Sequence, residues 1–128
     1  MRLLVPSLSL AIVGVAVVIG SIWPVIAADP YRKLKDVEVK PSLVGMEVTD
    51  QVHWAEHYMP NGTYRVWSMG KARTGKWRAE KGELCVDDGT PNPELCTEVW
   101  LSGNKVQFRL PEGFVAREGV LQAQRPRP

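Results

Sequence analysis

The two histidines of the chain stand four positions apart, in the sequence His53-Trp54-Ala55-Glu56-His57. The string fits H-x-x-E-H, a pattern in which two histidines bind zinc for hydrolytic chemistry. This chemistry requires a helix, because residues four positions apart share one face of a helix and lie about one turn from each other. The value of the motif therefore depends on the element that contains residues 53–57.

The flanking residues predict a strand. Pro60 would end a helix only three residues after His57. Asn61-Gly62 follows, and an Asn-Gly pair between two strand-like runs is typical of a β-hairpin turn. Side chains alternate between the two faces of a strand. Val52, Trp54, Glu56 and Tyr58 then share one face, and His53, Ala55, His57 and Met59 share the other.

This strand argues against a metal site at His53, Glu56 and His57. Glu56 would point away from both histidines, whose Cβ atoms would lie roughly 13 Å apart at ~3.3 Å per residue. The inverted zincin peptidases, which use this pattern, carry a further acidic ligand on a second helix, and no such helix is predicted here. We expect neither a metal nor a cofactor, and a zinc metalloenzyme is the remote alternative.

Other catalytic motifs are absent from the sequence. No serine has the context G-x-S-x-G, and no phosphate-binding loop, dinucleotide fingerprint or EF-hand loop occurs. A cysteine nucleophile is disfavoured, because residues 1–28 indicate export and an oxidising compartment would join Cys85 to Cys96 in a disulfide. We therefore expect a protein that is not an enzyme.

A second group of residues suits binding. Basic and aromatic side chains interleave over one stretch, which is the candidate ligand or partner surface: Trp67, Lys71, Arg73, Lys76, Trp77 and Arg78. This pattern can bind nucleic acid, but an exported protein rarely meets nucleic acid. The near balance of 16 Lys and Arg against 14 Asp and Glu does not indicate a nucleic-acid partner either. The alternatives are a solvated hairpin, a surface for an anionic ligand or lipid headgroups, and a cavity lined by tryptophans.

Residues 1–28 indicate export. Arg2 is followed by an uncharged apolar run, Leu3–Ile26, and by small residues that permit cleavage after Ala27 or Ala28. We expect a signal peptide with a hydrophobic helix. A run of ~20 apolar residues also spans a bilayer, so a retained anchor is the alternative. The rest of the chain is expected to be periplasmic or secreted, or else anchored to the inner membrane and facing the periplasm.

The two cysteines agree with an exported chain. Cys85 and Cys96 are an even pair, which predicts a disulfide. Metal ligation is the competing interpretation, and it would require more Cys or His nearby. On the chain-entropy model, closing this short loop stabilises the fold by roughly 2–3 kcal/mol.

Short alternating runs separated by turn residues fill positions 43–121, which indicates an all-β domain. In the clearest run, Lys105–Leu110, apolar and polar side chains alternate strictly. About eight strands in an antiparallel meander predict a lipocalin-like barrel or a curved open sheet. The expected strands are Val44–Thr49, Gln51–Met59, Thr63–Ser68, Gly75–Ala79, Glu83–Asp87, Thr97–Leu101, Lys105–Leu110 and Phe114–Leu121.

The flanks of this domain are polar. Residues 29–42 contain Pro30 and Pro41, and we expect a linker with at most one helical turn. Residues 122–128 have no apolar anchor and are expected to form a disordered tail.

The order of motifs resembles that of small exported proteobacterial proteins with an uncharacterised domain. The shared pattern is L-x-G, Y-x-P-[DN]-G-[ST], G-x-W, [LF]-C and a second C. In this chain it corresponds to Leu43-x-Gly45, Tyr58–Thr63, Gly75-Lys76-Trp77, Leu84-Cys85 and Cys96. The resemblance implies a small secreted β-domain with a Cys85–Cys96 disulfide and no catalytic residues.

Export, a disulfide, aromatic-rich strands and missing catalytic motifs predict a non-enzymatic domain that binds a small ligand or a protein partner. Contact with a membrane is expected only if residues 3–26 are retained as an anchor. The alternative function is a membrane-tethered accessory subunit of an envelope complex.

Overall fold

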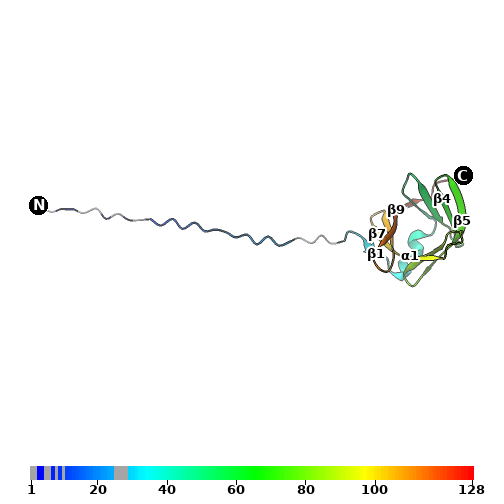
Figure 1. Ribbon diagram of the computed structural model, residues 1–128, viewed down its shortest axis with the longest axis horizontal. Helices are drawn as coiled ribbons and strands as arrows, with labels where there is room; N and C mark the ends of the chain where they lie inside the picture. The colour runs from blue at the N-terminus through cyan, green and yellow to red at the C-terminus, as the bar shows by residue number, and fades with distance from the viewer. Residues whose placement is uncertain (1–2, 5–6, 8, 10, 25–28) are drawn as a thin grey trace.

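The computed structural model describes residues 3–4, 7, 9, 11–24 and 29–128. The described part of the apolar N-terminal run is extended and exposed, and the expected helix is not seen there (Figure 1). Over the described ranges, no helix combines the length and the apolar character that crossing a membrane requires. The expected cleavage positions, Ala27 and Ala28, lie outside the described residues.

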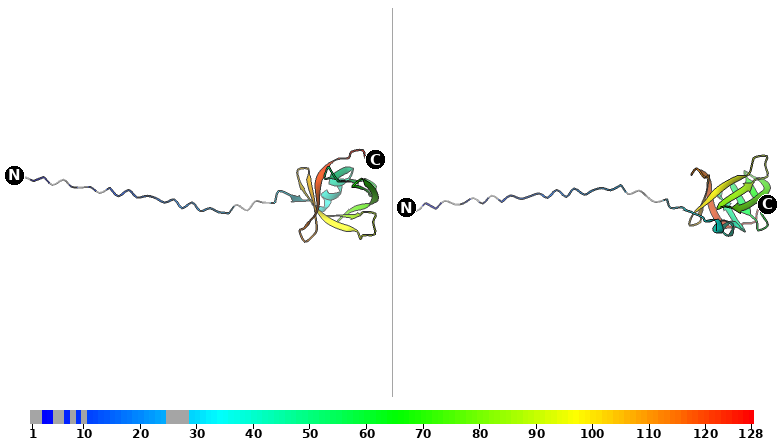
Figure 2. Two further views of the ribbon diagram at one scale, coloured as in Figure 1. Left: turned by 45° about the horizontal axis from the view of Figure 1, so that its top comes forward. Right: turned by 90° about the horizontal axis from the view of Figure 1, so that it is seen from below.

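Eight antiparallel strands close into a barrel (Figure 2). Each strand pairs with the next along the chain, and the last pairs with the first. The all-β meander is confirmed, and the sheet is a closed barrel and not an open curved sheet. The strands are β2 (Met46–Thr49), β3 (Trp54–Tyr58), β4 (Thr63–Ser68), β5 (Lys71–Glu80), β6 (Glu83–Asp87), β7 (Leu95–Ser102), β8 (Lys105–Arg109) and β9 (Val115–Ala123).

Alternation along the strands places one apolar face inside the barrel. In β8, Val106 and Phe108 are fully buried, as the strict alternation of this strand predicted. Trp77 of β5 is also inside, and its indole Nε1 donates to the carbonyl of Met59 at 2.9 Å. The interior is formed mainly by Tyr58, Tyr64, Val66, Trp77, Leu84, Val86, Val99, Val106 and Phe108.

The second strand is shorter than expected, because Asp50 builds a turn before it. One carboxylate oxygen of Asp50 accepts the backbone N–H groups of Val52, His53 and Trp54 at 2.7–3.0 Å. A carboxylate that satisfies three successive N–H groups stabilises a turn in place of strand pairing. The strand β3 therefore begins at Trp54 and not at Gln51.

Residues 29–42 are not a linker, so this expectation was wrong. They contain a two-residue strand, β1 (Arg32–Lys33), which pairs with β7, and most of a helix, α1 (Asp36–Leu43). The segment is held by three buried side chains, those of Leu34, Val39 and Leu43. Val39 and Leu43 share one side of the helix, and Leu34 precedes the helix. These three apolar side chains order the segment although most of its residues are polar.

The helix α1 closes one end of the barrel. Its Asp36 accepts the N–H of Gly82 in the β5–β6 turn at 2.8 Å. Beyond its C-terminus, the N–H of Gly45 donates to the carbonyl of Tyr58 at the end of β3, at 2.7 Å. The turns β3–β4 and β5–β6 lie at this end, so the opposite ends of the same strands form the second end of the barrel.

The C-terminal boundary also differs from the expectation. The strand β9 continues to Ala123, two residues past the predicted end of the domain. Residues 124–128, here called the strap, lie on the outer face of the barrel, where Arg127 forms an ion pair with Glu47. The expectation of a disordered tail at 122–128 was therefore wrong. The segment has no apolar anchor, but the buried carboxylate of Glu47 binds Arg127 and holds the segment on the barrel.

Candidate functional site

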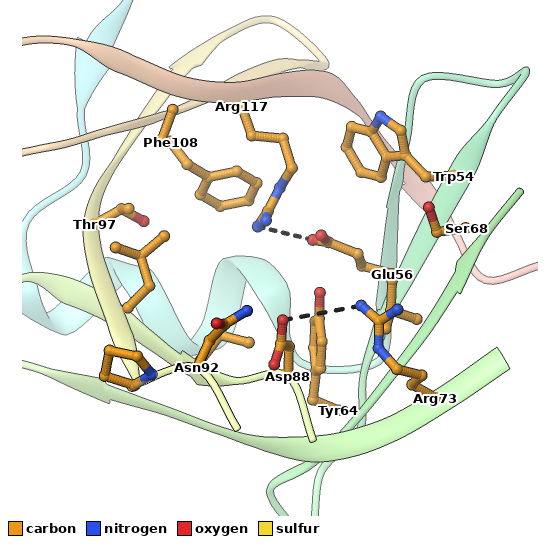
Figure 3. Close-up of a pocket in the computed structure, with 15 residues that line it drawn as sticks. Trp54, Glu56, Tyr64, Ser68, Arg73, Asp88, Asn92, Thr97, Phe108 and Arg117 are labelled. Atoms are coloured by element: carbon orange, nitrogen blue, oxygen red, sulfur yellow. Dashed lines mark ion pairs between the residues drawn. The ribbon is translucent and has the colours of Figure 1, made fainter. Parts of the chain in front are cut away.

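A cavity of about 550 Å³ occupies the barrel interior at the end opposite α1. Its wall receives side chains from seven strands, β3 to β9, and its rim includes the loop between β6 and β7 (Figure 3). Pockets for small molecules usually measure about 300–1,000 Å³. The cavity therefore has the size of a site for a small molecule.

An ion pair lies in the wall of this cavity. Nη2 of Arg117 on β9 is 3.0 Å from Oε2 of Glu56 on β3, and the Glu56 side chain is only 3% exposed (Figure 3). The same oxygen accepts the hydroxyl of Tyr58 at 2.5 Å. Burial opposes the charge on Arg117, but the Glu56 carboxylate together with Tyr58 and Tyr64 outweighs burial and raises the pKa of the guanidinium. Arg117 is therefore a permanent cation of the cavity.

Tyr64 adds a second donor. Burial raises the pKa of its hydroxyl far above the ordinary value, and the nearby Glu56 charge raises it further. Burial raises the pKa of Tyr58 in the same way. Both hydroxyls stay protonated at any physiological pH, so each can donate a hydrogen bond.

Apolar and aromatic side chains complete the wall. The Arg117 guanidinium carbon lies 4.7 Å from the centre of the Phe108 ring and 5.6 Å from that of Trp54. Cations over aromatic faces are held by the ring quadrupole. Val66, which stands beside Glu56 on the neighbouring strand, and Val86 also line the cavity. The interior therefore combines an apolar body with one polar corner.

A second ion pair stands near the rim. Nη2 of Arg73 on β5 is 3.9 Å from Oδ2 of Asp88 (Figure 3). Hydrogen bonds from Thr90 are the main cause that lowers the pKa of Asp88, with a smaller effect of Arg73. Both partners are about one third exposed or more, so water screens this pair and it can open.

The residues of the H-x-x-E-H string lie in three different places. His53 belongs to the β2–β3 turn, where its Nδ1 is 2.9 Å from Asp50. Glu56 faces the barrel interior, and His57 faces outward. His57 is nevertheless buried, since its Nε2 meets Glu47 at 2.7 Å beneath the strap. The alternation predicted for the strand holds, and of the two histidines only His53 is exposed.

The candidate basic and aromatic surface is divided between the two faces of β4 and β5. Arg73 and Trp77 face the interior, and Arg73 lines the cavity. Trp67 lies on the outer face, where Arg127 of the strap is 5.9 Å from its ring centre. The other members of the set, which are exposed along β5, are Lys71, Lys76 and Arg78.

The disulfide is formed as predicted. Cys85 and Cys96 are directly opposite each other on β6 and β7, with an S–S distance of 2.07 Å. Their neighbours Leu84 and Thr97 face inward, so the bridge lies on the outer wall. Glu94 is close to both sulfurs, but the bond between the sulfurs leaves no thiolate for a metal.

Arg117 was missed by the sequence analysis, and Glu56 was noticed only as part of the zinc pattern. A signal for Arg117 was present, because alternation along β9 puts it on the same face as Leu121, which packs on the core. A charged residue on the inward face of a barrel strand indicates a polar group with an internal partner.

No protein family, curated protein or solved structure matches this chain.

Proposed function

We propose that this chain is an exported, non-enzymatic barrel that binds a small molecule inside its cavity. The proposed ligand has an apolar body and one hydrogen-bond-accepting group. The observation that carries the proposal is the cavity of about 550 Å³ with Arg117 in its wall. Export to the periplasm follows from the N-terminal apolar run and is compatible with the disulfide.

The polar preference follows from the groups that are left for a ligand. Nε of Arg117 is buried and has no hydrogen-bond partner among the described residues. Tyr64 lines the same cavity and keeps its proton. The Glu56 carboxylate is already engaged by Tyr58 and Arg117. Arg117, whose Nε has no partner, is therefore the donor left for a ligand, and an acceptor such as a carbonyl or carboxylate oxygen complements it.

The same arrangement supports binding over catalysis. A general base needs a free carboxylate or imidazole beside its substrate. Glu56 is committed to an ion pair and a tyrosine, and His57 faces the other side of the wall. Nothing in this polar corner is arranged to accept a proton from a ligand.

The test compares a cavity-filling variant with a matched outer variant. Val66→Trp places an indole in the cavity, whereas Val52→Trp adds the same group at an exposed turn position. The probe is 2-naphthoic acid, with naphthalene as its counterpart that lacks an acceptor. We expect the unaltered chain and Val52→Trp to bind 2-naphthoic acid more tightly than naphthalene. We expect at least a tenfold loss in Val66→Trp.

Equal binding of the probe to both tryptophan variants would contradict an interior site. Native mass spectrometry of the protein released from envelopes provides a second readout, because a bound small molecule adds its mass to the folded chain. The same spectra report the N-terminus: a start at Ala28 or Asp29 supports an exported free domain, and retention of residues 1–27 supports the tethered accessory subunit.

A further inference from the structure

The outer face of the barrel carries a fully buried carboxylate, that of Glu47 on β2. Outward-facing residues of a small barrel normally contact water, so a buried charge there requires a dedicated partner. Glu47 stands opposite His57 on β3 and Gln122 on β9, so its position is set by two neighbouring strands. Nε2 of His57 and Nε2 of Gln122 each lie 2.7 Å from a carboxylate oxygen of Glu47.

The third partner comes from the strap. Nε of Arg127 donates to Oε1 of Glu47 at 2.6 Å. Burial opposes ionisation of Glu47, but hydrogen bonds from Arg127, Gln122 and His57 outweigh it and hold its pKa at about 2. Arg127 is the permanently charged member of the three. The barrel supplies the polar cradle, and the strap supplies the matching cation.

The residues around Arg127 fit the wall as well. Nε1 of Trp67 donates to the backbone oxygen of Pro128 at 2.8 Å, and the rings of His57 and Trp67 pack edge to face with centroids 4.6 Å apart. Gln124 reaches the carbonyl of Met46 at 3.3 Å. An indole N–H beside a proline is a common way to bind an extended Pro-containing segment, whose backbone is stiff before it binds.

From these contacts we infer that Glu47, His57 and Trp67 form a receptor site for an arginine-proline peptide, and that residues 124–128 occupy it within the same chain. The buried carboxylate of Glu47 binds the arginine side chain, and the indole of Trp67 donates a hydrogen bond to the backbone oxygen of the following proline. It lies on the outer wall and is separate from the cavity, so it does not depend on the proposed small-molecule function.

The strap contains its own control. Arg125-Pro126 repeats the dipeptide Arg127-Pro128 two positions earlier. Arg127 pairs with Glu47, whereas Arg125 forms no ion pair within the described part of the chain. A site that recognises one arginine must distinguish these two positions, and a general attraction between basic peptide and protein surface would not.

The test uses a chain that ends at Ala123 and a fluorescent peptide of sequence Gln-Arg-Pro-Arg-Pro. The shortened chain keeps all eight barrel strands. We expect it to bind the peptide, and we expect the intact chain to bind at least tenfold more weakly because its own strap occupies the site. In the peptide, glutamine in place of the second arginine should cost at least tenfold in affinity, and glutamine in place of the first should cost less than threefold.

Glu47→Gln in the shortened chain should abolish peptide binding. If the shortened chain fails to fold, the full-length variant Arg127→Gln releases the strap and takes its place in the titration, with Arg125→Gln as its matched control. A folded shortened chain that does not bind the peptide overturns the inference. Equal losses for the two arginines also overturn it, and so does an intact-chain dimer that Arg127→Gln dissociates, because the strap would then occupy a second copy.

Discussion

Glu56 and Arg117 form an ion pair inside the barrel although their strands, β3 and β9, do not pair with each other. Both strands pair with β2, and Val48 of β2 lies opposite Glu56 on one side and Leu121 on the other. The ion pair therefore connects the two strands that flank β2, beside the seam where the barrel closes.

Removing one partner of this pair should destabilise the fold. Glu56→Gln and Arg117→Met each leave a buried group without its counter-charge, and we expect a loss of about 3 kcal/mol for each in urea unfolding. The double variant should lose at least about 1 kcal/mol less than the two single losses added together. Arg32→Gln, which breaks an exposed pair with Glu38, should cost much less, because water screens the pair. Additive single losses would contradict the coupling.

The disulfide should stabilise the barrel without defining it. Cys85→Ser with Cys96→Ser frees a loop between strands that remain hydrogen-bonded to each other. The expected loss is about 2–3 kcal/mol, with an unchanged far-ultraviolet circular dichroism spectrum. Reduction of the unaltered chain should give the same loss. A reduced chain that unfolds at room temperature would show that the bridge contributes more than loop entropy.

The buried Glu47 carboxyl predicts a specific dependence of stability on pH. Its pKa is lowered from 4.5 to about 2 in the folded chain. A group with a depressed folded pKa stabilises the fold above its unfolded pKa, and this contribution is lost as the pH falls toward the folded value. Glu47→Gln should therefore be less stable than the unaltered chain near neutral pH.

The difference between these two chains should shrink between about pH 5 and pH 2, with an upper bound of about 3 kcal/mol. The measurement is the free energy of unfolding in urea at a series of pH values. Lowered pKa values are also found for four other carboxyls, those of Asp29, Glu38, Asp50 and Asp88. Because both chains contain these four groups, their contributions cancel and the difference reports Glu47. A difference that does not depend on pH would contradict an ionised Glu47.

Gly75 should not tolerate a side chain. A Cβ at this position of β5 would overlap the carbonyl oxygen of Asp87, which belongs to the neighbouring strand β6. Gly75→Ala should cost more than about 2 kcal/mol, because backbone has to move. The comparison is Gly113→Ala, where the space is open and φ is +96°, with a loss of about 1 kcal/mol from backbone strain alone. Equal losses in thermal unfolding would contradict the crowding at Gly75.

Local signals in the sequence predicted most of the strands. Asn61-Gly62 and the alternation of Lys105–Leu110 act over a few residues, and both correspond to features of the barrel: Gly62 has φ +85° in the turn, and Val106 and Phe108 are buried. The disulfide was predicted for a similar reason, since two cysteines on paired strands require no distant information. Such features depend on neighbours in the chain.

Features that depend on distant partners were not predicted. Closure rests on the pairing of Val48 with Leu121, which no local pattern encodes. Arg127 has no apolar neighbour, so its segment was expected to be disordered, while its binding partner is Glu47 in the first barrel strand. The cavity has the same origin: Glu56 and Arg117 become a pair only after the barrel closes.

The bridge on the outer wall also determines where the barrel can change. Cys85 and Cys96 fix the base of the β6–β7 hairpin, so the register of both strands is set before the chain enters the rim loop. Within that loop, Gly89 is constrained by the nearby carbonyl of Thr74. Asn92 and Pro93 line the cavity. Because the bridge fixes the strands below them, we expect that these two residues can be replaced without shifting those strands. If the proposed cavity site binds a ligand, libraries varied at these two positions are expected to alter its selectivity on a constant scaffold.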